Sequence, residues 1–199
     1  MKPIERGEIL GLAEYETVRE RFRTRIIGEK KRRRVQLGPN ASALFENRDT
    51  VLLQIQEMLR TERITRPSAI DHEIETYNAL LPGDDELSCT VMIAIADPSQ
   101  RDSFLRAALG FERHLALTAG SERVPARGMD RGGAAANQTT AVHYLKLPLP
   151  KKVADELRGQ SHGQALTATF ALEVDHPAYR ARAELPAETV WELAEDLRA

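Results

Sequence analysis

Residues 68–81, SAIDHEIETYNALL, hold the densest group of side chains that could do chemistry. His72 and Glu75 are three positions apart, so on a helix they share one face and could both bind one metal ion. Glu73 could act as a general base, and Tyr77 could supply a hydrogen bond. These residues are compatible with a metal-binding pair, with a polar catalytic cluster, and with a salt-bridge network between two helices. They identify no cofactor, because neither HExxH nor the two Glu-x-x-His segments of a di-iron bundle is present.

The preceding segment FENRDTVLLQIQEMLR, residues 45–60, supplies the other half of this candidate site. Asn47 is the expected N-cap of a helix, and Asp49 complements the positive end of the helix dipole. Arg48 projects toward the apolar stripe of that helix, where a charged group needs either a carboxylate partner or a path to water. In a catalytic interpretation Arg48 binds a substrate carboxylate or phosphate, with Asp49 beside it. The apolar stripe consists of Val51, Leu52, Ile55, Met58 and Leu59.

Two further segments carry clustered arginines. Residues 19–34 end in KKRRR, but Phe22 is their only aromatic residue and glutamates dilute the charge, so a solvated helix face or a docking surface for an acidic partner is favoured over nucleic-acid binding. Residues 119–138 are rich in Gly, Ala and polar residues, as in a functional or mobile loop. This loop lacks GxxxxGK[ST] and GxGxxG motifs, so nothing supports a nucleotide site there. Its arginines recur every four residues, at Arg123, Arg127 and Arg131.

Composition excludes several classes of protein. The 199 residues are 42% hydrophobic and 29% charged, as in an ordinary globular protein, and the net charge of −2 gives no overall attraction to nucleic acid or an anionic membrane. No apolar run approaches the roughly 20 residues that span a bilayer, and the N-terminus has charges where a signal peptide needs an apolar core. We therefore expect a cytoplasmic protein without a membrane span. Cys89 is the only cysteine and lies in an apolar run, so it is expected to be a buried strand thiol.

The periodicity of apolar residues predicts helices over 8–34, 47–64 and 68–81, with a hairpin turn at Gly38-Pro39-Asn40. From residue 87 the pattern becomes that of strands, three of which run into a proline that can open a helix. The order strand, proline, helix, strand at 91–119 recurs at 142–173, which suggests an internal duplication. The predicted fold is α+β, in which a helical N-terminal part with a short hairpin packs on a mainly antiparallel sheet with short helices. We place these parts at 1–83 and 84–199, or within one compact domain.

The segments LFENRDTVLLQIQEMLRTERI and HEIETYNALLPG, with the opening MKPIERGEILGLAEYE, resemble the bacterial family called domain of unknown function 3501. The resemblance brings no established activity. It implies a role beside rubrerythrin-type proteins and iron–sulfur proteins related to heterodisulfide reductase, whose genes neighbour those of the family. With one cysteine, this chain cannot hold a four-cysteine cluster, so such a cofactor would belong to the partner.

The leading hypothesis is therefore a cytoplasmic, non-catalytic accessory protein that docks on a redox or peroxide-defence partner, such as a rubrerythrin-type or iron–sulfur protein. The basic N-terminal helix and the 119–138 loop are the candidate contacts. The alternative is a metal-dependent or acid/base enzyme with a polar site between the 47–64 and 68–81 helices. The sequence sets no oligomeric state.

Overall fold

The computed structural model describes residues 1–129 and 137–199. Its N-terminal part is mainly helical. Its helices meet in a cluster of buried residues that includes Ile4, Val51, Ile55 and Tyr77. The cluster forms because α2 and α3 each bury one face, with apolar residues three and four positions apart. We call this the helical part, and its elements are η1 (Arg6–Glu8), α1 (Leu12–Arg32), α2 (Arg48–Thr61) and α3 (Pro67–Asn78).

The described strands form two antiparallel sheets. Sheet A has the order β1-β2-β3-β7-β6, and sheet B has the order β5-β4-β8-β9. The strands of sheet A are β1 (Arg34–Leu37), β2 (Ala41–Phe45), β3 (Glu86–Ile93), β7 (Val142–Pro148) and β6 (Arg127–Gly128). The strands of sheet B are β5 (Glu122–Pro125), β4 (Leu115–Ala119), β8 (Phe170–His176) and β9 (Tyr179–Glu184). The α+β class with antiparallel strands is confirmed, although there are two sheets where one was expected.

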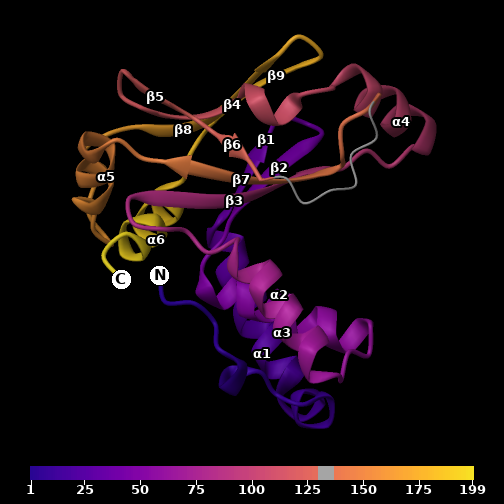
Figure 1. The fold of residues 1–199 in the computed structure, drawn as a ribbon. Helices are drawn as coiled ribbons and strands as arrows, with labels where there is room; N and C mark the ends of the chain where they lie inside the picture. The colour runs from indigo at the N-terminus through magenta and orange to yellow at the C-terminus, as the bar shows by residue number, and fades with distance from the viewer. Residues whose placement is uncertain (130–136) are drawn as a thin grey trace.

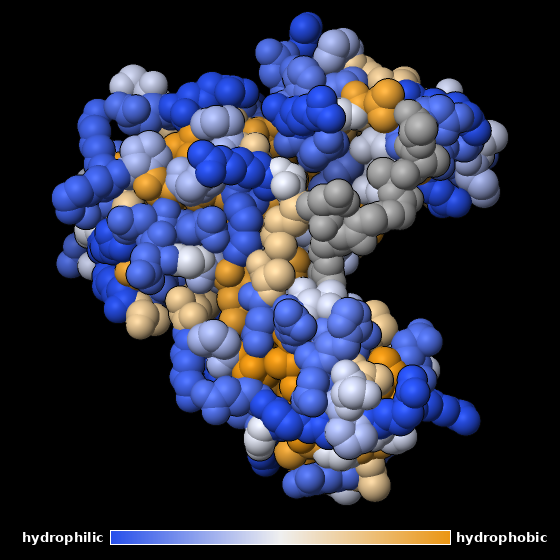
Figure 2. All heavy atoms as spheres, viewed as in Figure 1, coloured by the Kyte–Doolittle hydropathy of each residue, from blue (hydrophilic) through white to orange (hydrophobic). Residues whose placement is uncertain are grey.

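The main hydrophobic core lies between the two sheets. Alternate residues of β7, such as Leu145 and Leu147, and alternate residues of β8, such as Phe170 and Leu172, are buried in this core. Figure 1 shows the helical part below sheet A, while sheet B lies at the top of the view with no α-helix beyond it. In Figure 2 mostly hydrophilic residues cover that upper surface. The outer face of sheet B is therefore open to solvent.

Three short helices connect or follow the strands, and each begins at or directly after a proline, as the sequence predicts. They are α4 (Pro98–Ala107), α5 (Lys151–Arg158) and α6 (Ala187–Asp196), and a 3-10 turn η2 (Phe111–His114) precedes β4. The units β3-α4-β4 and β7-α5-β8 both run from sheet A to sheet B, where β3 pairs with β7 and β4 pairs with β8. The internal duplication suggested by the sequence thus has a counterpart in the topology.

The β1–β2 hairpin links the helical part to the rest of the chain, because β2 pairs along its length with β3. A domain boundary near residue 83 would therefore separate β1 and β2 from the other strands of sheet A. The start of the third helix also differs by one residue from the predicted range 68–81, because α3 begins at Pro67 with Arg66 as N-cap. Proline is suited to the first helical position because its φ is fixed and it needs no N–H partner there.

The connection between α2 and α3 contains Arg63 at a φ of 52°. The N–H of Ile64 donates to the Leu59 carbonyl at 2.9 Å, and the N–H of Arg63 donates to the Arg60 carbonyl at 3.3 Å, which is a Schellman helix end. Since glycine adopts positive φ without steric cost, Arg63→Gly should raise the free energy of unfolding by about 1 kcal/mol in urea denaturation. Arg66→Gly is the matched control, because Arg66 has a φ of −69° and should gain nothing. A stabilisation shared by both variants would contradict this explanation.

Candidate functional site

Arg48 is bound by the N-terminal segment. Its Nη2 donates to both carboxylate oxygens of Glu8 at 2.5 and 2.6 Å, and its guanidinium also donates to the Lys2 carbonyl at 3.0 Å. The Arg48 side chain is 29% exposed, so it reaches solvent as well as a carboxylate. The hydrogen bond from Arg48 holds the pKa of Glu8 below its usual value. Arg48 therefore fixes residues 2–8 to the start of α2.

The start of α2 has the predicted cap. The Asn47 side chain accepts the Thr50 N–H at 2.9 Å, and the Thr50 hydroxyl accepts the Asn47 N–H at 3.0 Å, so the two residues form a capping box. Asp49 accepts a hydrogen bond from Arg25 of α1 at 2.5 Å. The polar residues that open α2 thus cap the helix and join it to α1.

The residues predicted on the third helix are spread over several environments. His72 and Glu75 are exposed, Glu73 is half-buried, and Tyr77 is buried in the core of the helical part. Asn78 binds the backbone N–H and carbonyl of Ile4, at 2.9 Å each. Across the described residues, no three His, Cys, Asp or Glu side chains come together to hold a metal ion. The roles assigned to Arg48, Asp49, His72, Glu73, Glu75 and Tyr77 remain predictions.

A metal measurement separates the open possibilities at His72 and Glu75. Two exposed ligands on one helix leave most of a metal coordination sphere to water, so we expect less than one equivalent of iron, manganese or zinc after anaerobic purification without a histidine tag. Elemental mass spectrometry should give the same content for wild type and His72→Ala. A stoichiometric metal that disappears in the variant would establish a metal site on α3.

The basic residues of α1 are largely neutralised by other helices. Arg19 binds both oxygens of Glu57 in α2 at 2.7 and 2.8 Å, and Arg32 binds Glu192 in α6 at 2.6 Å. The hydrogen bond from Arg19 lowers the pKa of Glu57, which also accepts the hydroxyl of the buried Tyr15. These ion pairs further reduce the positive charge of the basic segment 19–34. Within the described ranges, the basic residues of this segment without an ion pair include Arg21, Lys31 and Arg34.

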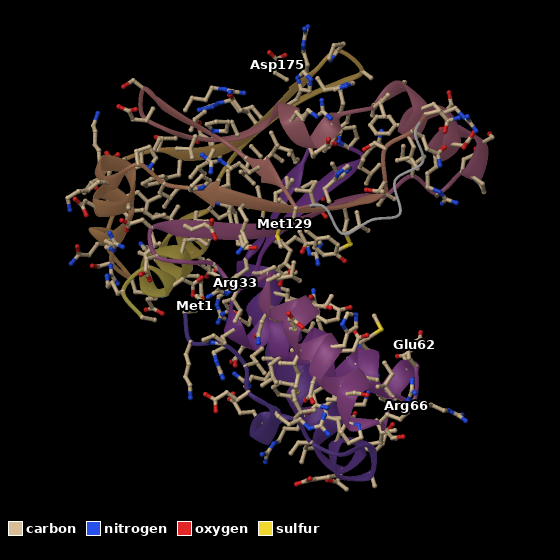
Figure 3. The ribbon with its side chains drawn as sticks, viewed as in Figure 1. Met1, Arg33, Glu62, Arg66, Met129 and Asp175 are labelled. Atoms are coloured by element: carbon tan, nitrogen blue, oxygen red, sulfur yellow. The ribbon has the colours of Figure 1, made fainter. Side chains whose placement is uncertain are left out.

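A buried ionic cluster centred on Arg33 joins the end of α1 to α6. Arg33, labelled in Figure 3, is 2% exposed and lies 3.2 Å from Glu29, 3.1 Å from Glu192 and 2.5 Å from Asp196. Burial opposes the charge on Arg33, but the hydrogen bond to Asp196 and the nearby carboxylates outweigh it and raise its pKa. Burial raises the pKa of Asp196, which the guanidinium offsets only in part. The sequence contained a signal that Arg33 is buried. Arg33 is five helical turns from Tyr15 and therefore lies on the same, buried face of the helix.

A second buried polar group lies where the helical part meets sheet A. Glu46 is 1% exposed and accepts hydrogen bonds from Thr50 at 2.5 Å and Thr90 at 2.6 Å. Burial lowers the pKa of the nearby Lys30, and the charge of Glu46 opposes that shift. Cys89 is 1% exposed, and burial raises the pKa of its thiol to about 12. The prediction that Cys89 is a buried strand thiol is confirmed.

The histidines of the β part make structural contacts. His143 is buried against Phe111, with ring centroids 5.3 Å apart, and burial lowers its pKa. His176 contacts the Leu109 carbonyl at 3.2 Å, and the Nδ1 of His114 lies 2.8 Å from the Asp175 carbonyl. Ring stacking and backbone contacts thus account for these three histidines.

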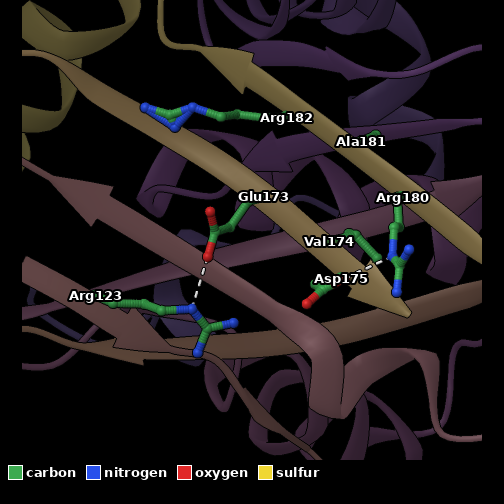
Figure 4. Close-up of a pocket in the computed structure, with 7 residues that line it drawn as sticks. All are labelled: Arg123, Glu173, Val174, Asp175, Arg180, Ala181 and Arg182. Carbon is green, nitrogen blue, oxygen red and sulfur yellow. Dashed lines mark hydrogen bonds and ion pairs between the residues drawn. The ribbon is translucent and has the colours of Figure 1, made fainter. Parts of the chain in front are cut away.

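The outer face of sheet B contains a shallow, charged depression (Figure 4). Arg123 of β5 donates to Glu173 of β8 at 2.6 Å, and Arg180 of β9 donates to Asp175 at 2.8 Å. Arg182 lies on the same face and approaches the Thr118 hydroxyl at 3.5 Å. Part of the expected 119–138 loop is thus strand, because β5 and β6 lie within it. Arg131 falls outside the described residues.

A family model and a solved structure each match almost the whole chain. The profile of the family described as "Protein of unknown function (DUF3501)" matches residues 3–197. A crystal structure of a novel protein of unknown function from Burkholderia pseudomallei K96243 is 30% identical, with a TM-score of 0.89 over 98% of this chain and 100% of that one. No curated protein matches. Among the described helices, none combines the length and apolar character needed to cross a membrane. With almost its whole length matched, the chain belongs to the DUF3501 family.

Proposed function

We propose that this protein is a non-catalytic accessory protein that docks on a redox or peroxide-defence partner. The observation that carries the proposal is that polar side chains suited to catalysis are bound to other side chains of the same chain. Arg48, Asp49 and Glu57, which could have served a substrate, are bound to Glu8, Arg25 and Arg19. Such contacts hold elements of the fold together, so these three side chains are engaged in structural pairs instead of being free for acid/base chemistry.

The redox chemistry belongs to the partner in this proposal. Cys89 is buried and its thiol has a raised pKa, so it is a poor nucleophile and a poor ligand. The described residues hold no group of three metal-binding side chains. A partner of the rubrerythrin or iron–sulfur type, as the family resemblance implies, would bring its own cofactor.

Two surfaces are available for docking. The first is the exposed side of α1, where Arg21 and Lys31 are unpaired among the residues that the structure describes. The second is the outer face of sheet B, where arginines from β5 and β9 surround the depression of Figure 4. Charged, solvent-exposed surfaces of this kind give association that is fast and sensitive to salt.

Affinity purification from the native host tests the proposal. We expect one recurrent partner that carries iron and that is released as the salt concentration rises. A bait of similar size and net charge controls for non-specific capture. A chain that always emerges alone, or one that turns over a substrate in isolation, would contradict the accessory role.

A further inference from the structure

We propose that the outer face of sheet B binds an extended, acidic segment of a partner protein, with Arg182 as the central contact. This inference rests on the proposed function and specifies the surface and the chemistry of the partner. The evidence for it is that the ion pairs observed on sheet B are not all those that the alignment of β8 and β9 favours.

The register places Glu173 directly opposite Arg182 and Asp175 directly opposite Arg180. Opposite charges at such positions normally pair with each other. Asp175 and Arg180 do so, but Glu173 accepts from Arg123 of β5, which reaches across β4. Arg182 is left with the 3.5 Å contact to Thr118 and has no carboxylate partner among the described residues.

The other two arginines also keep free donors. The hydrogen bond from Arg123 and the one from Arg180 each use the Nε atom, so the terminal guanidinium nitrogens remain for a ligand. Figure 4 shows the three guanidinium groups around the depression, with Glu173 and Asp175 between them. Three arginines against two carboxylates make the depression positive, although the whole chain has a net charge of −2.

The spacing of the arginines fits an extended segment. Arg180 and Arg182 are two residues apart on one strand, so they point to the same face about 7 Å apart. An extended peptide with carboxylates at alternate positions presents its charges at the same interval. Each carboxylate can accept two parallel N–H bonds from one guanidinium, which gives geometric specificity as well as attraction.

The depression is a poor surface for nucleic acid. Single-stranded nucleic acids bind through aromatic side chains on which bases stack, and the seven lining residues include no aromatic one. Glu173 and Asp175 also repel a continuous row of phosphates. Glu173 and Asp175 also select among peptides. They repel an acidic residue that lies next to them, so the peptide must place neutral residues there and acidic residues beside the arginines.

A titration of the isotopically labelled protein by nuclear magnetic resonance tests this surface directly. The probe is a synthetic peptide in which glutamate and threonine alternate, at low ionic strength. We expect shift changes confined to amides of β5, β8 and β9, and affinity that is roughly tenfold weaker in Arg182→Gln. Arg66→Gln is the matched control, since it removes an exposed arginine between α2 and α3, outside both candidate docking surfaces. A peptide with the same composition but consecutive glutamates should bind less tightly.

In the titration, any of these results would overturn the inference: no binding by wild type, shift changes located on α1, unchanged affinity in Arg182→Gln, or tighter binding of oligothymidylate than of the alternating peptide. Failure here is distinguishable from failure of the accessory role, because the titration needs no native partner. If wild type and Arg182→Gln recover the same native partner in equal amounts, the accessory role stands and the assignment of this surface is wrong.

Discussion

Replacing Arg33 with methionine is expected to lower the free energy of unfolding by about 3–5 kcal/mol, the cost of removing one partner from a buried ionic cluster. Arg33 is 2% exposed and is surrounded by Glu29, Glu192 and Asp196. Methionine fills similar space but leaves these carboxylates desolvated and close to one another. Urea denaturation of both proteins at neutral pH measures the loss.

Arg32→Met is the matched control for burial. Arg32 is the preceding residue of α1 and also binds Glu192, at 2.6 Å, but its side chain is 44% exposed. In Arg32→Met the buried Glu192 keeps its contact with Arg33 at 3.1 Å, and only the more exposed arginine is lost, so this variant should lose only about 0–1 kcal/mol. If Arg32→Met and Arg33→Met lowered the free energy of unfolding equally, the burial of Arg33 would not explain how much it contributes to stability.

The deficit of Arg33→Met should depend on pH. Burial already raises the pKa of Asp196, and removing the guanidinium that offsets this effect leaves that pKa further above its value in the unfolded chain. Groups of this kind contribute stability that is fully present below the unfolded pKa and is lost as pH rises through the folded pKa. The difference between wild type and variant should therefore grow between about pH 4 and pH 7. A difference that is constant over this range would contradict the electrostatic explanation.

Local features of the fold could be predicted from the sequence because neighbouring residues determine them. The Asn47 cap and the proline starts of the short helices depend on a few adjacent positions, and both are confirmed. The division into two sheets could not be predicted. Alternation shows that a strand has two faces, but it does not show which strand lies beside it, and β4 pairs with β8 more than fifty residues away.

The same limit applied to the candidate site. The sequence showed that Arg48 needed a carboxylate, but Glu8 is 40 residues away and was not identified as the partner. Arg33 was assigned to a solvated basic run, although its position on the face of Tyr15 and Ile26 indicated burial. Its partners Glu192 and Asp196 come from the last helix, so only tertiary structure brings the cluster together.

Replacing Gly38 with alanine is expected to be the other large effect, about 2–5 kcal/mol, because two costs combine. Gly38 has a φ of 72°, which strains any L side chain, and its added Cβ would lie 2.5 Å from the Tyr179 hydroxyl oxygen. That hydroxyl donates to the Leu37 carbonyl at 2.5 Å and accepts from the Asn40 N–H at 3.2 Å. Gly38 thus allows the β1–β2 turn of sheet A to close against β9 of sheet B.

Two comparisons separate the strain from the contact. Gly120→Ala has a similar φ of 55° with no atom within 4 Å of the new Cβ, so it should cost only about 1–2 kcal/mol. Tyr179→Phe alone loses the two hydrogen bonds, which is expected to cost about 1–3 kcal/mol. In Gly38→Ala/Tyr179→Phe the closest atom is gone, so the double variant should be less destabilised than the sum of the single variants by about 1 kcal/mol or more. The free energies of unfolding are measured by urea denaturation. If the losses of the two single variants add up to that of the double variant, the Tyr179 hydroxyl does not exclude a side chain at residue 38, and backbone strain alone explains the effect of Gly38→Ala.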